Sequence, residues 1–271
     1  HHFRQTDLFC QKSEMRRVLS DEILPGVRER KEDDMTEQYI VLDLETTGLS
    51  PKDDKILEIG AARIADGCVQ EVYQAFVDPH IKIPERITEL TGITDEMVIG
   101  QKSNEEAVRE LVQFCGELPL LGHNILFDYG FLKHSAVNLG IPFEREGIDT
   151  LKIARELLPA EEKKSLEALC GRFGISREHA HRALDDALAT HELYLALRRD
   201  CPVEREELFS PHPLIYRAKR QGPITPAQKG YLKDLAAYHK IELEADPESL
   251  TKNEASRLID RIILTYGRIR R

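Results

Sequence analysis

Apolar positions in the first half of the chain follow strand patterns. Tyr39–Leu42 is a short continuous apolar run, which is typical of a strand buried on both faces. Two further apolar stretches, Ile56–Ile64 and Val69–Val77, flank a short segment that contains Gly67, and this arrangement predicts a β-hairpin. A fourth run, Leu118–Leu121, predicts another short strand.

Helical periodicity dominates after the hairpin. Asn104–Cys115 carries Ala, Val and Leu on one stripe, with Asn104 as the expected N-cap. Further helices are expected through Phe131 and Leu132 to about Gly140, and over Thr150–Leu158, Ser165–Phe173 and Ala183–Leu197. An antiparallel start followed by strands that alternate with helices predicts an α/β domain with a mixed sheet.

The C-terminal region predicts two more helices. Thr225 is a candidate N-cap with Pro226 at the first helical position, and Thr251 and Glu254 have the spacing of a capping box. Together they predict a small helical module near the lower size limit for independent folding. Between the body and this module, several prolines indicate a linker. The predicted division is an N-terminal arm over 1–35, an α/β domain over 36–200, a linker over 201–222 and the module over 223–271.

Charge is unevenly distributed over the 271 residues. The net charge is −10, the segment 35–211 carries −14, and the segment 212–271 carries +5. The acidic body argues against passive coating of DNA, but it is compatible with an enzyme that holds divalent cations. For the basic tail, contact with DNA and a charged surface without a ligand both stay open.

Cysteine spacing and hydropathy argue against a disulfide-rich, zinc-binding or membrane-spanning protein. The five cysteines form no CxxC pair, so we expect a reduced cytoplasmic protein without a zinc site or disulfide framework. No apolar run approaches the roughly 18 residues of a membrane helix, and we expect no membrane partner.

Several acidic residues lie in apolar surroundings. Asp43 and Glu45 follow the first apolar run, and residues two apart in a strand share one face. Asp128 lies among Leu, Phe and Tyr, where a carboxylate is costly to bury without a partner. Asp186 shares its helical face with small and apolar residues, whereas Asp185 shares a more polar one. Taken singly, the alternative for Asp43 and Glu45 is the solvated end of a strand, which the sequence favours less. For Asp128 the alternative is an acid in the first turn of a helix, which is favoured when that residue is considered alone. For Asp185 and Asp186 the alternative is a helix-capping acid.

Taken together, these acids resemble the motifs of the DEDDh exonuclease superfamily, which includes the proofreading exonuclease of bacterial DNA polymerase III. The matching segments are Asp43-Leu44-Glu45, His123-Asn124 with Phe127-Asp128, His181 with Asp186, and the stretch Ile87–Thr94. His179 and Asp185 lack the spacing of the third motif. The resemblance implies a ribonuclease H-like fold with a mixed five-stranded sheet flanked by helices.

The same acids predict the cofactor. Two carboxylates about 4 Å apart repel by ~4 kcal/mol at an effective dielectric near 20, so a cluster requires cations or raised pKa values. All-oxygen ligands favour two divalent ions, Mg²⁺ or Mn²⁺. By resemblance, Asp43 bridges both ions, Glu45 and Asp186 hold the nucleophile-side ion, Asp128 holds the second ion, and His181 is the general base.

The resemblance also implies substrate contacts, from Thr46, Thr47, Leu49, Gly92, Ile93 and Asn124. The predicted function is a bacterial 3′→5′ exonuclease that releases nucleoside monophosphates from single-stranded or frayed DNA, in replication proofreading or repair. A DNA polymerase or another replication protein is the expected partner. The alternatives are a DEDDh ribonuclease that trims RNA 3′ ends and a catalytically idle nucleic-acid-binding subunit.

Overall fold

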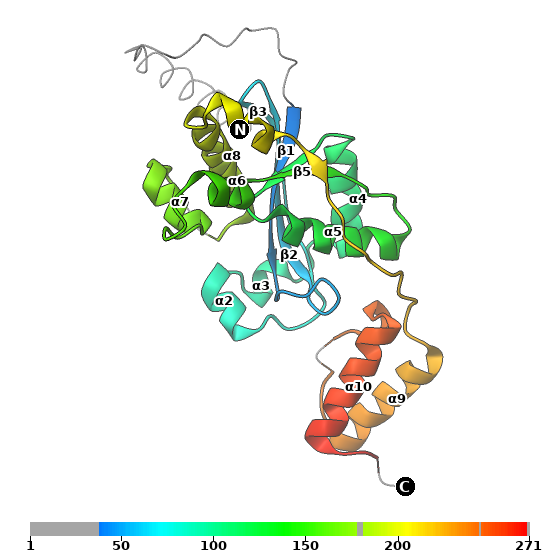
Figure 1. Ribbon diagram of the computed structural model, residues 1–271. Coiled ribbons are helices and arrows are strands. Elements are labelled where there is room, and N and C mark those ends of the chain that lie inside the picture. Colours follow the sequence, from blue (N-terminus) through cyan, green and yellow to red (C-terminus); the bar gives the residue numbers. More distant parts are fainter. Residues whose placement is uncertain (1–37, 178–180, 244, 270–271) are drawn as a thin grey trace.

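A mixed sheet with helices on both faces forms the body of the protein (Figure 1). The computed structural model describes residues 38–177, 181–243 and 245–269, so the predicted arm over 1–35 lies outside the described residues. The strand order is β3–β2–β1–β4–β5–β6. The strands are β1 Gln38–Thr46, β2 Ile56–Ala65, β3 Cys68–Phe76, β4 Leu120–Gly122, β5 Glu146–Asp149 and β6 His212–Pro213.

Strand directions confirm the mixed sheet that the sequence predicted. β1, β2 and β3 pair antiparallel, β1–β4 and β4–β5 are parallel, and β5–β6 is antiparallel. Within the described residues the sheet has six strands, so the expectation of five was wrong. The additional edge strand is only two residues long and contains Pro213, which left no strand signal in the sequence.

Both faces of β1 are buried, which explains its continuous apolar run. The body helices are α2 Glu85–Thr91, α3 Asp95–Val98, α4 Asn104–Cys115, α5 Ile125–Leu139, α6 Thr150–Leu157, α7 Leu166–Phe173 and α8 Ala183–Arg199. Ile40, Leu42 and Leu44 of β1 pack toward α4 and α5, whereas Tyr39 and Val41 pack toward α6, α7 and α8. Figure 1 shows α4 and α5 on one side of the sheet and α6 and α8 on the other.

Two local predictions require correction. Asp43 and Glu45 do not follow the first strand, because β1 continues through Thr46 and contains both acids. The N-cap of α4 is Ser103 rather than Asn104, since the Ser103 side chain accepts from the Glu106 backbone N–H and forms a capping box with it.

The C-terminal region forms two helices with their own apolar core (Figure 1). The helices are α9 Pro226–His239 and α10 Lys252–Tyr266, preceded by the 3₁₀ turns η1 Val203–Phe209 and η2 Pro247–Ser249 respectively. The predicted N-cap of α9 and the predicted capping box of α10 are both confirmed. Across the described residues, none of the helices combines the length and apolarity that crossing a membrane requires.

Candidate active site

β1 carries the first two acids of the candidate site on one face. Asp43 pairs in register with Gly60 of β2, and Glu45 pairs with Glu58. A Cβ atom on Gly60 would lie 2.1 Å from the backbone nitrogen of Leu184 and 2.2 Å from the carbonyl carbon of Ala183. The start of α8 therefore crosses the sheet directly against this glycine. This close approach brings the first turn of α8, with Asp186, to the acids of β1.

Asp128 reaches the same place from the first turn of α5. Its Oδ1 accepts a 3.0 Å hydrogen bond from the backbone N–H of Leu44, the residue between the two β1 acids. The side chain is only 3% exposed. The helix begins after Asn124, whose backbone is left-handed at φ 71° and whose N–H donates to Asp149 at 2.9 Å. The sharp turn at Asn124 thus aims the first turn of α5 at β1.

Asp186 is buried in α8, and Asp185 beside it is only partly buried, as the helical spacing predicted. The Oδ1 atom of Asp186 accepts from Arg177 Nε at 2.9 Å and from Nη2 at 2.5 Å. Its Oδ2 accepts from the backbone N–H of His181 at 3.3 Å. His181 has a left-handed φ of 64°, and this turn holds the histidine over the start of α8.

Burial and mutual repulsion make the deepest acids hard to ionise. Burial raises the pKa of Asp43 well above its usual range, and the charges of Asp128, Glu45 and Asp186 raise it further. Burial likewise raises the pKa of Asp128 well above its usual range, although hydrogen bonds from backbone N–H groups oppose this shift. A bound cation would reverse these shifts by favouring the charged forms.

Glu45 has a raised pKa as well. Burial is the largest cause, followed by the charges of Asp186 and Glu58, and together they raise the pKa of Glu45 to about 7 against the opposing charges of Arg177 and Arg182. Perturbed carboxyl groups of this kind are enriched at functional sites.

The donor set fits a divalent cation. One ligand atom each of Glu45, His181 and Asp186 lies within 4.8 Å of the other two. Asp43 and Asp128 are electrostatic neighbours of this group, but their atoms are not part of it. The guanidinium of Arg177 supplies one positive charge to Asp186, so a metal ion held by this carboxylate would share or replace that partner. Carboxylate-rich sites of this type suit Mg²⁺ and Mn²⁺.

Sequence reasoning missed a second charge pair beside the site. Glu58 is completely buried in β2, and Arg182 donates to both of its carboxylate oxygens, from Nη2 at 2.9 Å and from Nε at 3.1 Å. Glu58 also accepts from the backbone of Ala183 at 3.3 Å. The pair fastens the N-terminus of α8 to β2. A lone acid within an otherwise apolar strand was the available signal, whereas nothing in the local pattern indicated Arg177.

Three of the predicted substrate residues closely follow the two acids of β1 in the chain. Thr46 and Thr47 are buried at the end of β1, and Leu49 in the next turn is 84% exposed. Gly92 is the C-cap of α2 with φ 71°. The Ile93 side chain is fully buried against other apolar residues, so a substrate contact there would have to use the backbone.

The motif histidine beside Asn124 is held by structural contacts. The ring nitrogens of His123 lie 2.9 Å from Thr150 Oγ1 and 2.8 Å from the Lys164 carbonyl oxygen. Burial lowers the pKa of this imidazole, which favours its neutral form. His123 therefore ties β4 to α6 and the segment before α7.

The sequence model of a family described as exonuclease matches residues 40–194, the part of the chain that contributes the four acids and His181 of the site. The chain belongs to this exonuclease family. The match and the relatives below confirm the predicted resemblance to DEDDh and polymerase III-type exonucleases. A second model, of a protein family of unknown function, matches residues 221–268.

Relatives of this exonuclease chain are much longer proteins. A protein named DNA polymerase III PolC-type from Clostridium perfringens is 42% identical over 175 residues, which cover 65% of this chain and 12% of that protein. One of the same name from Thermotoga maritima is 37% identical over 182 residues, covering 65% and 13% respectively. The chain thus spans about an eighth of the length of these relatives.

Solved structures share the fold. E. coli exonuclease I in a zinc-bound complex with single-stranded DNA aligns with a TM-score of 0.54 and 19% identity, over 61% of this chain and 41% of that one. Another exonuclease I structure aligns with a TM-score of 0.55 and 19% identity, over 63% and 42%. At this identity the likeness establishes the ribonuclease H-like fold alone.

Proposed function

We propose that the protein is a metal-dependent 3′→5′ exonuclease that hydrolyses the terminal phosphodiester of DNA and releases nucleoside 5′-monophosphates, in replication proofreading or repair. The observation that carries the proposal is the convergence of carboxylates from β1, α5 and α8 beside His181. The names of the polymerase III relatives favour DNA over RNA as substrate.

The four acids would hold two divalent cations, Mg²⁺ or Mn²⁺. Asp43, at the centre of the repulsion, would be shared between them, with Glu45 and Asp186 on one side and Asp128 on the other. When bound, such ions acidify a water molecule and stabilise the negative charge that develops on the phosphate.

His181 would act as the general base. The residue is exposed, and its ring nitrogen lies close to carboxylate oxygens of Glu45 and Asp186. Histidine is the side chain that most often serves as a general base. As the attacking water bonds to phosphorus, His181 takes the water proton. The bond from phosphorus to the 3′-oxygen of the preceding nucleotide breaks, and that oxygen takes a proton from solvent to become the new 3′-hydroxyl.

The substrate contacts and the physiological setting belong to the same proposal. The exposed Leu49 side chain suits a wedge between the last two bases, and the backbone of Thr46 and Thr47 suits the terminal 3′-hydroxyl. Asn124, Gly92 and the backbone of Ile93 would complete the nucleotide pocket. We further propose a bacterial cytoplasmic setting and a replication polymerase as partner, because the named relatives are bacterial polymerases. Affinity capture by the cognate polymerase would test that partner.

The division into domains is also proposed. An exonuclease domain over 36–200 and a helical module over 223–271 agree with the limits of the two family matches. Because β6 pairs with β5 and Phe209 is buried in the body core, the fragment to test is residues 36–222. Cooperative unfolding of this fragment in urea would support a boundary between body and module. Aggregation or non-cooperative unfolding of that fragment would contradict it.

The test of function compares single-stranded DNA and RNA oligonucleotides of matched sequence, each labelled at its 5′ end. We expect Mg²⁺- or Mn²⁺-dependent shortening of DNA from the 3′ end, nucleoside 5′-monophosphate as product, and complete inhibition by a chelator. Asp43→Ala should abolish turnover while the chain stays folded. Retention of a tenth of wild-type turnover at saturating metal would overturn the assignment, and preferential RNA degradation would favour the ribonuclease alternative.

Two neighbouring acids of α8 provide a matched test of which carboxylate serves as a metal ligand. Asp186→Asn should abolish activity because it removes a charged ligand, whereas Asp185→Asn should keep activity within about threefold of wild type. Equal losses of activity in both variants would mean that the site tolerates no change in this turn of α8. The assignment of Asp186 as a metal ligand would then be unsupported.

A further inference from the structure

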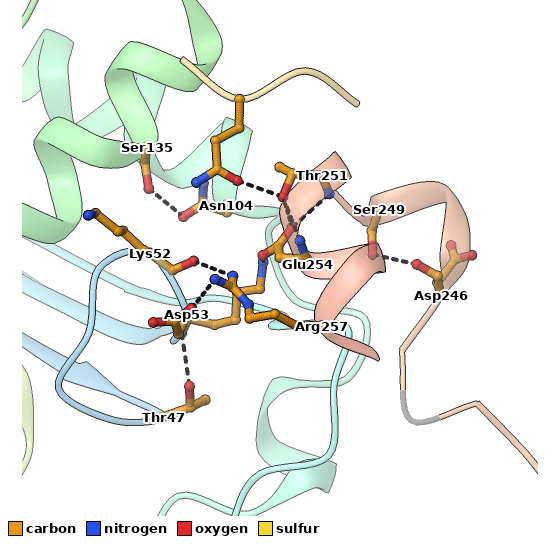
Figure 2. Close-up of polar contacts among 12 residues, drawn as sticks. Thr47, Lys52, Asp53, Asn104, Ser135, Asp246, Ser249, Thr251, Glu254 and Arg257 are labelled. Carbon is orange, nitrogen blue, oxygen red and sulfur yellow. Dashed lines mark hydrogen bonds and ion pairs between the residues drawn. The ribbon is translucent and has the colours of Figure 1, made fainter. Parts of the chain in front are cut away.

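Two charged side chains of α10 contact the loop that leads out of the candidate site. This β1–β2 loop, residues 47–55, starts two residues after Glu45. Glu254 forms an ion pair with Lys55. Arg257 forms one with Asp53 (Figure 2). Arg257 Nη2 also donates to the Lys52 carbonyl at 2.9 Å. Because Glu254 and Arg257 are three residues apart, they share one face of the helix.

Lys55 is hydrogen-bonded directly to Thr47, one of the predicted substrate residues. Thr47 donates its backbone N–H to the Lys55 carbonyl at 2.8 Å, and the Lys55 N–H donates to Thr47 Oγ1 at 2.9 Å. A displacement of Lys55 therefore moves Thr47. Thr47 in turn is followed by Gly48 and the exposed Leu49.

α10 is itself anchored to the body at other points. Glu254 and Thr251 form the capping box of the helix (Figure 2). Thr251 Oγ1 donates to Gln221 Oε1 at 2.9 Å. The Gln221 backbone N–H donates to Asn138 of α5 at 2.9 Å. A separate antiparallel bridge joins Ile81 to Ala245. The N-terminus of α10 is thus fixed to the body, and the loop is held against it.

Of the two ion pairs, the one with Lys55 is the better shielded from water. The side chains of Glu254 and Lys55 are 14% and 28% exposed, whereas those of Arg257 and Asp53 are 43% and 47% exposed. Burial raises the pKa of Glu254, but Lys55 and the hydrogen bonds of the capping box hold it below its usual range. Since exposed pairs contribute little and are screened by salt, Glu254 is the main contact.

Direct contact with a nucleic-acid strand is a weaker explanation for this side of the module. A cavity of about 770 Å³ separates the module from α2 and α3, beside the same loop. Its lining contains six acidic and four basic residues, and a surface of that balance does not attract a polyanion. The basic charge of the module is therefore not concentrated where it faces the site.

We propose that the C-terminal module positions the β1–β2 loop for substrate binding, with Glu254 and Arg257 as positioning residues. The expected change in KM rests on the proposed exonuclease function. The expected change in mobility of the loop rests on the loop contacts alone. Removal of the Glu254–Lys55 pair should loosen Thr47 and Leu49 without altering the acids of the site.

The experiment is a double-mutant cycle of Glu254→Gln and Lys55→Gln in the full chain. Glutamine also serves at the third position of a capping box, so Glu254→Gln removes the charge and keeps the cap. Glu248→Gln is the matched control, because it breaks the ion pair with Lys229 inside the module and does not touch the loop. Each protein is assayed for kcat and KM on a single-stranded oligonucleotide, and for hydrogen exchange of a peptide that covers residues 47–55.

We expect each single variant to raise KM by about two- to fivefold, which corresponds to the loss of one ion pair worth up to ~1 kcal/mol, with kcat within about twofold of wild type. The double variant should be no worse than the worse single variant, because the two side chains act as one pair. The loop amides should exchange faster in all three, and neither readout should change in the control.

Additive increases in KM, an unchanged KM, or an equal change in Glu248→Gln would overturn the inference. If wild type showed no nuclease activity, the proposed function would fail separately, and the exchange measurement would still decide the positioning role. Unchanged exchange of residues 47–55 in Glu254→Gln would overturn it in that case as well.

Discussion

Replacing Glu45 by glutamine should stabilise the metal-free protein at alkaline pH. The glutamine has nearly the same shape and removes a carboxyl group whose pKa is raised from 4.5 to about 7. A carboxyl with a raised pKa in the folded state retains its proton between these two values, so folding binds a proton in that window. The contribution of the Glu45 carboxyl to the stability of the wild type therefore falls as pH rises from about 4.5 to 7. Above pH 7 the whole of this loss in the free energy of unfolding applies.

The size of the stabilisation by Glu45→Gln follows from the pKa shift of Glu45. Each pKa unit corresponds to 1.36 kcal/mol, so the raised pKa of Glu45 amounts to about 3 kcal/mol at pH 8. Because Glu45 is partly exposed, this is an upper value. For a folded region of about 150–250 residues, it corresponds to roughly 6–12 °C in Tm. Removal of Glu45 also lowers the repulsion on Asp43, which adds in the same direction.

The assay is urea denaturation of wild type and Glu45→Gln in a chelator at pH 5 and pH 8. We expect the variant to gain about 3 kcal/mol at pH 8 and little at pH 5, and saturating Mn²⁺ to remove the gain, since the metal stabilises the wild-type carboxylate. The control is Glu89→Gln, an exposed acid of α2, which should change stability by less than about 0.5 kcal/mol. A variant that is no more stable than wild type at pH 8, or equally stabilised at both pH values, would refute the reasoning.

Three further predictions concern the site and its support. His181→Ala should lower kcat by about 10²–10⁴-fold, while calorimetry should show that the variant still binds metal; a larger loss of kcat in His179→Ala would mean that the third motif uses His179 instead. Gly60→Ala should cost about 3 kcal/mol or more in chemical denaturation, because its Cβ would collide with the backbone of α8; a near-neutral result would mean that α8 does not need this close approach. Leu49→Ala should leave Tm unchanged and raise KM on frayed DNA ends, whereas an unchanged KM would exclude the wedge role.

Local pattern was sufficient for the elements that carry the acids. A continuous apolar run predicted β1, and the two-residue spacing put Asp43 and Glu45 on one face. Helical spacing identified Asp186 rather than Asp185 as the buried acid, and cap chemistry predicted the starts of α9 and α10. These features depend on residues a few positions apart in the chain. The strand and helix periods determine which of those residues share one face, so they can be read from the sequence.

What the sequence determined by itself was therefore the type of each main element, the identity of the acids and the family resemblance that joined them. Tertiary structure alone decided the pairing of Arg177 with Asp186, the passage of α8 over Gly60, and the docking of α10 on the β1–β2 loop. The last of these joins Lys55 to Glu254, residues 199 positions apart. Pairings across such separations leave no period in the sequence, because they depend on how the packed layers bring distant segments together.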